Sequence, residues 1–311
     1  MFINFFISYV FAEETTMENR SIYNEIIDTA EKEDWSMVYG DEDKDHDNVY
    51  QIHSFKNNQE YLLLRDKNAQ VDGVNLILSP KGDKAAFWID ENYSSYALYI
   101  VNSDGARKTQ LLRVASGGWN AWSPDGKKIA FLSDVVNGGG FAKEASLYVI
   151  DIDTKAVNKI LTKEIDDMTY QAWSPSGDKI VYNYRGKMFI YDFKQNKRVS
   201  LCDGLSPSWS PVGEKILFYN RTRKSLDLLR LDSVVNHKND FVGEELVSSE
   251  KLGKGNIVAP FYWFPDGNYI FIGHLAPSET EIGLPYVLKV ESKKVEKLSD
   301  VSWYFSSWAK P

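Results

Sequence analysis

The sequence predicts an all-β fold of repeated four-stranded sheets. The first observation is a short phrase that occurs five times, in which an aromatic or apolar residue precedes a proline by two positions and a glycine follows the proline by two. Its prolines are Pro80, Pro124, Pro175, Pro211 and Pro265. The second is its spacing of 44, 51, 36 and 54 residues, close to the roughly 40 to 50 typical of propeller blades. The third is the β-branched and aromatic run after each copy.

The phrase itself is typical of a tight turn between two strands. Proline presets φ at the second position of such a turn, and the glycine two residues later accepts a positive φ that a side chain would oppose. The run after each turn suits the buried face of a strand. These predicted second strands are Ala85–Trp88, Ile129–Leu132, Ile180–Tyr182, Ile216–Tyr219 and Ile270–Ile272.

A third strand follows in every repeat, and a shorter fourth strand completes the blade. The third strands are expected at Ala97–Val101, Leu147–Asp151, Met188–Asp192, Leu228–Asp232 and Tyr286–Val290. Fourth strands are recognisable at Lys159–Thr162, Arg198–Leu201 and Glu296–Ser299.

Strands from both ends of the chain are predicted to form one further blade. Trp303–Pro311 looks like the opening strand of a repeat, because Pro311 lies 46 residues after Pro265. The other three strands of this blade are expected at Trp35–Tyr39, Val49–His53 and Tyr61–Leu64. Four-stranded sheets hide their faces by stacking radially. The prediction is therefore a six-bladed β-propeller whose ring is closed by N- and C-terminal strands, which removes an open sheet edge.

Three segments are predicted along the chain. Residues 1–12 are apolar from position 2 and end in Val10-Phe11-Ala12, like a signal peptide or its remnant, although no Lys or Arg precedes them. Residues 13–34 form a helical segment, with a capping box at Thr15–Glu18 and apolar residues at helical spacing. Residues 35–311 form the propeller. Export to the periplasm or the exterior is favoured, with a cytoplasmic location left open.

Composition limits the partners. With 311 residues, 43% of them hydrophobic, the chain can bury one large core. A net charge of −8 argues against nucleic acid, whose binding needs clustered Lys and Arg. The densest basic run, Arg221–Lys224, is interpreted as solvated surface. The single Cys202 allows no internal disulfide. No transmembrane segment is expected, because none reaches roughly 20 apolar residues, and we expect a monomer.

The stretch Trp122–Phe131, Trp-Ser-Pro-Asp-Gly-Lys-Lys-Ile-Ala-Phe, and its four relatives resemble the WD-repeat-like units of TolB-type six-bladed propellers. Such propellers also form the non-catalytic domains of prolyl-oligopeptidase-family enzymes. The resemblance covers residues 74–311 directly and 35–65 by inference. It implies the fold rather than one activity, because the family uses this scaffold for many tasks. Neither the additional N-terminal domain of TolB nor a hydrolase domain is expected here, so a Tol–Pal role or peptidase activity is not predicted.

No motif for catalysis or for a cofactor is found, and no cofactor is expected. The sequence has no nucleophile elbow, zinc-binding His-Glu-x-x-His or phosphate-binding loop. The four histidines, at 46, 53, 237 and 274, are far apart in sequence. A weak calcium site remains an alternative to a solvated acidic hairpin, with Asp41, Asp43, Asp45 and Asp47 as ligands, although the segment departs from an EF-hand loop.

An excess of aromatic residues precedes the turn phrases, in strands expected to line the channel mouth. Most should pack between blades, but some can form a platform for a ligand or peptide. The candidate ligand-binding residues are Trp119, Tyr170, Phe261, Tyr304 and Phe305.

Three functions are compatible with these observations. The favoured one is a non-enzymatic, exported propeller that recognises a protein, peptide or glycan. An enzyme acting on a polysaccharide is the second; it would need His53 or His274 beside acidic residues at the axis. The third is a structural module of an envelope assembly, which a large exposed apolar patch would favour.

Overall fold

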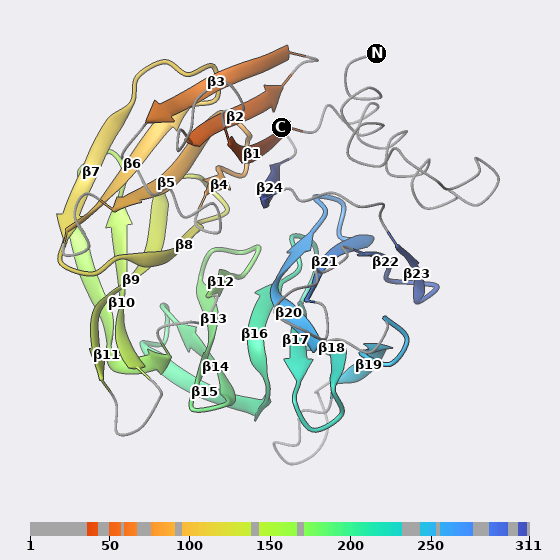
Figure 1. The fold of residues 1–311 in the computed structure, drawn as a ribbon. Coiled ribbons are helices and arrows are strands. Elements are labelled where there is room, and N and C mark those ends of the chain that lie inside the picture. Colours follow the sequence, from red (N-terminus) through yellow and green to blue (C-terminus); the bar gives the residue numbers. More distant parts are fainter. Residues whose placement is uncertain are drawn as a thin grey trace. The chain divides into compact units, whose positions relative to one another are not determined.

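The computed structural model describes residues 36–42, 50–56, 59–66, 76–90, 95–137, 143–166, 171–231, 243–252, 256–275, 286–297 and 304–309. Within this part, 24 strands form six four-stranded sheets (Figure 1). The predicted signal peptide, residues 1–12, and helical segment, residues 13–34, lie outside the described residues. Among the residues described, no helix is long and apolar enough to cross a membrane.

One compact unit contains strands β1–β12 and β24. Its first sheet has the order β24-β1-β2-β3, its second β4-β5-β6-β7 and its third β11-β10-β9-β8. The bounds are β1 Ser36–Glu42, β2 Tyr50–Lys56, β3 Gln59–Asp66, β4 Ile77–Leu78, β5 Lys84–Asp90, β6 Tyr96–Asn102, β7 Thr109–Val114, β8 Gly118–Trp122, β9 Lys128–Asn137, β10 Lys143–Asp151, β11 Val157–Asp166, β12 Ala172–Trp173 and β24 Tyr304–Ala309.

The other unit contains strands β13–β23. The order β16-β17-β18-β19 forms one sheet and β20-β21-β22-β23 another. The bounds are β13 Lys179–Tyr184, β14 Lys187–Asp192, β15 Lys197–Asp203, β16 Leu205–Trp209, β17 Lys215–Asn220, β18 Ser225–Arg230, β19 Glu244–Ser248, β20 Asn256–Trp263, β21 Tyr269–Leu275, β22 Tyr286–Lys289 and β23 Lys294–Lys297.

Strands from the two ends of the chain share one sheet. The C-terminal strand β24 pairs antiparallel with β1, with Ser36 opposite Ala309 and Gly40 opposite Tyr304 (Figure 1). β2 and β3 complete this sheet. The backbone groups along one edge of β1 are therefore paired rather than open to another chain.

The structure corrects the prediction of a single ring of six blades. Five four-stranded sheets are complete within one unit or the other, whereas the unit boundary falls between β12 and β13. The two-residue strand β12 lies in the same unit as β8, and Trp173 donates its indole N–H to the carbonyl oxygen of Ala121 at 3.1 Å. The described residues therefore define five complete blades within the units, and they contain no helix.

The turn phrases form as predicted. The backbone N–H of Gly126 donates to the carbonyl oxygen of Ser123 at 2.9 Å, and Gly126 has a φ of +69°. The Ser123 hydroxyl also accepts the backbone N–H of Lys128 at 2.9 Å. The copies at Ser79 and Ser174 make the same pair of bonds. Proline, glycine and serine thus each have a separate role in closing these hairpins.

The tryptophan that opens the phrase links neighbouring sheets within a unit. Trp122 donates its indole N–H to the carbonyl oxygen of Ile77 at 3.3 Å, and Trp263 donates to that of Ser208 at 3.2 Å. Since the rings are also buried, each tryptophan combines apolar burial with one hydrogen bond.

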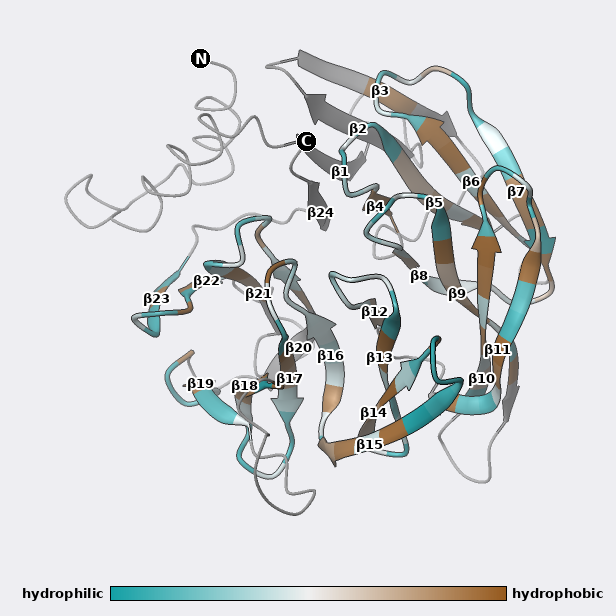
Figure 2. Ribbon diagram, turned by 180° about the vertical axis from the view of Figure 1, so that it is seen from behind, coloured by the Kyte–Doolittle hydropathy of each residue, from teal (hydrophilic) through white to brown (hydrophobic). Residues whose placement is uncertain are grey.

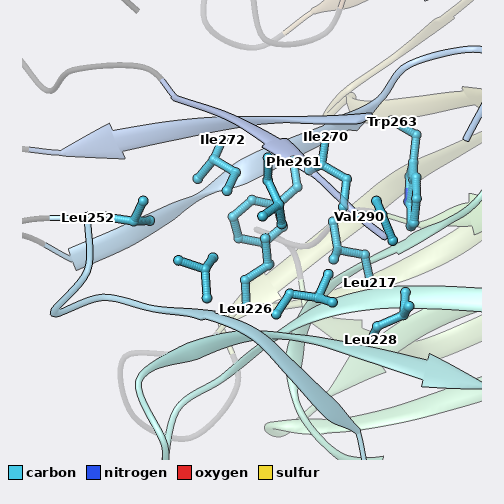
Figure 3. Close-up of a cluster of buried hydrophobic side chains, with 12 residues drawn as sticks. Leu217, Leu226, Leu228, Leu252, Phe261, Trp263, Ile270, Ile272 and Val290 are labelled. Carbon is cyan, nitrogen blue, oxygen red and sulfur yellow. The ribbon is translucent and has the colours of Figure 1, made fainter. Parts of the chain in front are cut away.

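Hydrophobic residues are concentrated along the strands, and the turns are mostly hydrophilic (Figure 2). One core cluster joins the sheets β16–β19 and β20–β23 (Figure 3). It consists of Leu217, Leu226, Leu228, Leu246, Val247, Leu252, Phe261, Trp263, Ile270, Ile272, Leu288 and Val290. A second core cluster joins sheets β4–β7 and β8–β11 around Trp88, Trp122 and Phe131. These clusters hold each unit together and fix the strands that carry the site described next.

Candidate functional site

Two successive repeats carry an amide at a position where other repeats are apolar. The position lies two residues before the residue that opens the turn phrase. It is occupied by Leu76, Asn120, Gln171, Pro207 and Phe261. Leu76, Pro207 and Phe261 are buried, as a core position requires. An amide there costs free energy unless hydrogen bonds compensate for its lost water, so Asn120 and Gln171 need an explanation that packing does not give.

A β-bulge lies beside Asn120 at the start of β8. Gly118 pairs with Leu132 and Asn120 pairs with the adjacent Phe131, so Trp119 is the extra residue of the bulge. Trp119 has a φ of +30° and is partly exposed. Positive φ is rare for a large aromatic residue, and such residues concentrate at functional sites. Bulges also redirect side chains beside such sites.

Hydrogen bonds from the surrounding elements hold this bulge. Gln171 donates its side-chain N–H groups to the carbonyl oxygen of Trp119 and, at 3.4 Å, to that of Ala130. Ser133 donates its hydroxyl to the carbonyl oxygen of Ser116 at 2.6 Å. Gln171 therefore fixes the backbone of the bulge with its nitrogen and leaves its side-chain oxygen for another partner.

The chain also approaches a tryptophan closely just before β8. A Cβ atom added at Gly117 would lie 2.7 Å from the ring of Trp88. Glycine is required there because any side chain would displace that ring. The indole of Trp88 is thereby packed against the start of β8.

Four buried polar atoms around this bulge have no hydrogen-bond partner in the described part of the chain. They are Asn120 Oδ1 and Nδ2, Gln171 Oε1 and Trp88 Nε1. Trp88 is 2% exposed and Gln171 5% exposed. Leaving one such group unpaired costs about 1–3 kcal/mol, so this concentration of unpaired groups is costly for the ligand-free chain.

Asn120 and Trp88 lie on the same side of β8. Asn120 is opposite Phe131 in the register, and the Phe131 ring centroid is 5.8 Å from that of Trp88. Side chains of directly paired residues project from the same face of a sheet. We call Trp88, Trp119, Asn120 and Gln171 the β8 site.

The polar groups of the β8 site do not titrate near physiological pH. Its two amides and its indole N–H are neutral near physiological pH, and together they offer both donors and acceptors. They can orient a ligand by hydrogen bonding, but they cannot serve as a general acid or base. Among the described residues, no group of three or more His, Cys, Asp or Glu residues is arranged to hold a metal ion.

Of the five predicted ligand-binding residues, the structure describes the side chains of Trp119 and Phe261, and it places them in different environments. Trp119 lies in the β8 site, whereas Phe261 is 5% exposed and packs in the core cluster between two sheets (Figure 3). Tyr170 lies outside the described residues. Tyr304 and Phe305 belong to β24 and Asp41 to β1, but their side chains are outside the described part, as are Asp43, Asp45 and Asp47 entirely. The side chains of all four histidines also fall outside it.

Sequence reasoning missed Asn120 and Gln171. Aromatic residues drew attention because they are often found at binding surfaces, whereas single amides in strands are common. The signal that identifies them is the comparison of repeats at one position, where an amide replaces a buried apolar residue twice in succession.

A second polar cluster lies at the run Arg221–Lys224, whose four residues are exposed, as predicted. Arg223 forms an ion pair with Asp227, whose side chain is fully buried, and donates to the carbonyl oxygen of Gly243 at 2.8 Å. Asn220 and Ser225 donate to the same carboxylate at 2.8 and 2.6 Å. Because these partners occupy both carboxylate oxygens of Asp227, the cluster stabilises the turn between β17 and β18.

A third cluster lies on β9, β10 and β11. Lys159 and Tyr148 both donate to Asp134 Oδ2, the lysine at 2.7 Å. The hydrogen bond from Lys159 lowers the pKa of Asp134, while burial and the Asp134 carboxylate raise the pKa of Tyr148. Because Tyr148 is held protonated, it is not poised to act as a base.

Together the four-stranded blades and the neutral β8 site define a β-propeller with a candidate binding site. The profile of the dipeptidyl peptidase IV N-terminal region matches residues 123–208. No curated protein sequence matches the chain.

Solved structures are similar over most of the chain. TolB from Acinetobacter baumannii is 16% identical, with a TM-score of 0.66 over 96% of this chain and 74% of that one. An oligogalacturonate lyase from Vibrio parahaemolyticus is 12% identical, with a TM-score of 0.55 over 84% and 71%. The periplasmic gluconolactonase of Pseudomonas aeruginosa is 10% identical, with a TM-score of 0.53 over 85% and 82%. At these identities the similarities show the propeller fold alone.

Proposed function

We propose that this chain is a non-enzymatic binding propeller that recognises an uncharged polar ligand at the β8 site. The observation that carries the proposal is the set of unpaired neutral polar atoms around a strained bulge, on Trp88, Asn120 and Gln171. A bound ligand that hydrogen-bonds to these atoms would offset their desolvation. Functional sites commonly retain such locally unfavourable features.

Neutral amides favour recognition over catalysis. Acid–base catalysis needs a group whose pKa lies near the working pH, and none of the polar atoms of the β8 site belongs to such a group. Two of the structurally similar proteins are described as a lyase and a lactonase. Their identity to this chain is too low to transfer either reaction.

We also propose that the protein is exported. The apolar residues 2–12 support this, as does the similarity to a gluconolactonase that is described as periplasmic. Cell fractionation of the full chain tests the proposal. Recovery in the periplasm or medium that is lost when residues 2–12 are deleted is the expected result, and cytoplasmic recovery of both forms would contradict export.

The binding proposal is tested by affinity capture from the native envelope fraction. Wild-type protein, Asn120→Leu and the control Asn158→Leu are immobilised in parallel. Asn158 is exposed on the edge strand β11, away from the β8 site. Wild type and Asn158→Leu should retain the same molecule, which Asn120→Leu should lose. Equal retention by all three forms would refute the assignment of the site, and cleavage of a polysaccharide by the purified protein would refute a non-enzymatic role.

A further inference from the structure

The β8 site has a hydrogen-bonding pattern that restricts the chemistry of its ligand. The amide of Asn120 supplies an acceptor and a donor side by side, and both lack a partner in the part of the chain that is described. Trp88 adds a donor, and Gln171 adds an acceptor. Because the oxygen and nitrogen of the Asn120 amide are bonded to one carbon, a ligand that matches this amide must donate and accept hydrogen bonds over a short distance.

Charged ligands fit this pattern poorly. Carboxylates and phosphates are bound by charge-assisted hydrogen bonds from Arg, Lys or His. The polar atoms of the β8 site belong to amides and an indole. Burying an ion against them would leave the cost of its desolvation uncompensated.

Hydroxyl groups fit the pattern well. Each hydroxyl both donates and accepts, so two hydroxyls on adjacent carbons can satisfy the oxygen and the nitrogen of one Asn amide. Trp119 lies beside them, partly exposed and directed by the bulge. Its ring offers an apolar face with a polar edge, which suits a sugar ring that combines C–H and O–H groups.

A peptide strand fits less well. β8 is an edge strand of its sheet, where an extended peptide could add through main-chain hydrogen bonds. The bulge at Trp119 interrupts the regular spacing of backbone groups that such pairing needs. The unpaired groups are also side-chain atoms rather than strand backbone.

We infer that the β8 site binds an uncharged oligosaccharide that carries hydroxyl groups on adjacent carbons. The inference rests on the proposed binding function and names its ligand class. Because the four polar atoms are shielded from solvent in the ligand-free chain, binding requires residues 117–120 to move and uncover them. The register shift between Gly118 and Asn120 is where the regular pairing of β8 with β9 is interrupted.

Isothermal titration calorimetry of the full chain tests the inference. The probes are neutral hexasaccharides of glucose, mannose, galactose and xylose, with hexagalacturonate and a hexapeptide of alanine and glycine as comparators. At least one neutral hexasaccharide should bind, and Asn120→Leu should weaken it at least 10-fold while Asn158→Leu binds as wild type. A deoxy analogue that lacks one of the contacted hydroxyls should bind at least 10-fold more weakly, since a missing hydroxyl leaves a buried group unpaired.

The outcomes separate the ligand class from the binding function. If the β8 variant loses an envelope ligand but wild type prefers hexagalacturonate or the peptide, the saccharide inference is wrong and the binding function stands. If neutral sugars bind equally to wild type and Asn120→Leu, the β8 site is not the sugar site and the inference is also wrong. If no probe binds and capture is unaffected by Asn120→Leu, both proposals fail.

Discussion

Replacing Asn120 by leucine should stabilise the ligand-free protein. Leucine has nearly the same shape as asparagine but no polar atoms, so the substitution removes the unpaired Oδ1 and Nδ2 from the start of β8. Leaving such an amide buried and unpaired costs about 1–3 kcal/mol. The free energy of unfolding should therefore rise by about 1–3 kcal/mol, a Tm increase of about 2–6 °C for a chain of this size. Urea unfolding and differential scanning calorimetry measure the change.

The matched control is Asn183→Leu. Asn183 is fully buried on a strand, and its Oδ1 accepts the backbone N–H of Ser206 at 3.1 Å. Ser206 is itself a positive-φ residue, with a φ of +52°, where the pairing of β16 with β17 shifts. Here leucine leaves the Ser206 N–H unpaired, so the free energy of unfolding should fall by about 1–3 kcal/mol.

The two substitutions must move stability in opposite directions. If Asn120→Leu destabilises the protein as much as Asn183→Leu does, the Asn120 amide is paired in solution, and the argument that the β8 site awaits a ligand fails. If the Asn120 amide is retained for function at a cost in stability, the leucine variant should be more stable than wild type but should no longer bind the ligand.

Three further predictions concern charges and the thiol. Arg223→Met should lower the free energy of unfolding, measured by urea titration, by about 3–5 kcal/mol, because Asp227 then stays buried without its cation. The control Arg221→Met changes an exposed residue and should alter the free energy of unfolding by less than about 0.5 kcal/mol. Hydrogen bonds from Lys194 and Ser176 hold the pKa of Asp178 far below its usual value, so its contribution to stability is present above about pH 4 and is lost as acid protonates it. Unfolding measured at pH 7 and pH 3 should show a smaller difference for Asp178→Asn, and an unchanged difference would argue against the ion pair. Burial raises the pKa of Cys202 to about 11, so iodoacetamide at pH 8 should alkylate the folded protein about 100-fold more slowly than the urea-unfolded chain, and equal rates would show that the thiol is accessible.

Much of the fold could be predicted because it depends on local chemistry. Proline and glycine at fixed positions define the hairpins, and the Ser123 and Gly126 bonds confirm the turn read from the phrase. The pairing of β24 with β1 followed from counting strands in the repeat. The division into two units could not be predicted in this way, because it depends on contacts between residues that are far apart in sequence.

The candidate site was only partly accessible from the sequence. Trp119 could be selected as an aromatic residue before the turn phrase, and so could Phe261, although the structure buries the latter in the core. The two residues look alike in sequence because aromatic character does not reveal exposure.

The repeat alone therefore determines the strands, their turns and the pairing of the chain ends, because each is set by residues that are close in sequence or equivalent between copies. Tertiary structure decides which side chains are buried and which buried atoms find a partner. Among the described residues, the Asn183 side chain accepts a hydrogen bond from Ser206, whereas the Asn120 side chain has no partner. Whether a buried polar group finds a hydrogen-bond partner depends on groups from separate strands. It therefore cannot be predicted from the type of the residue alone.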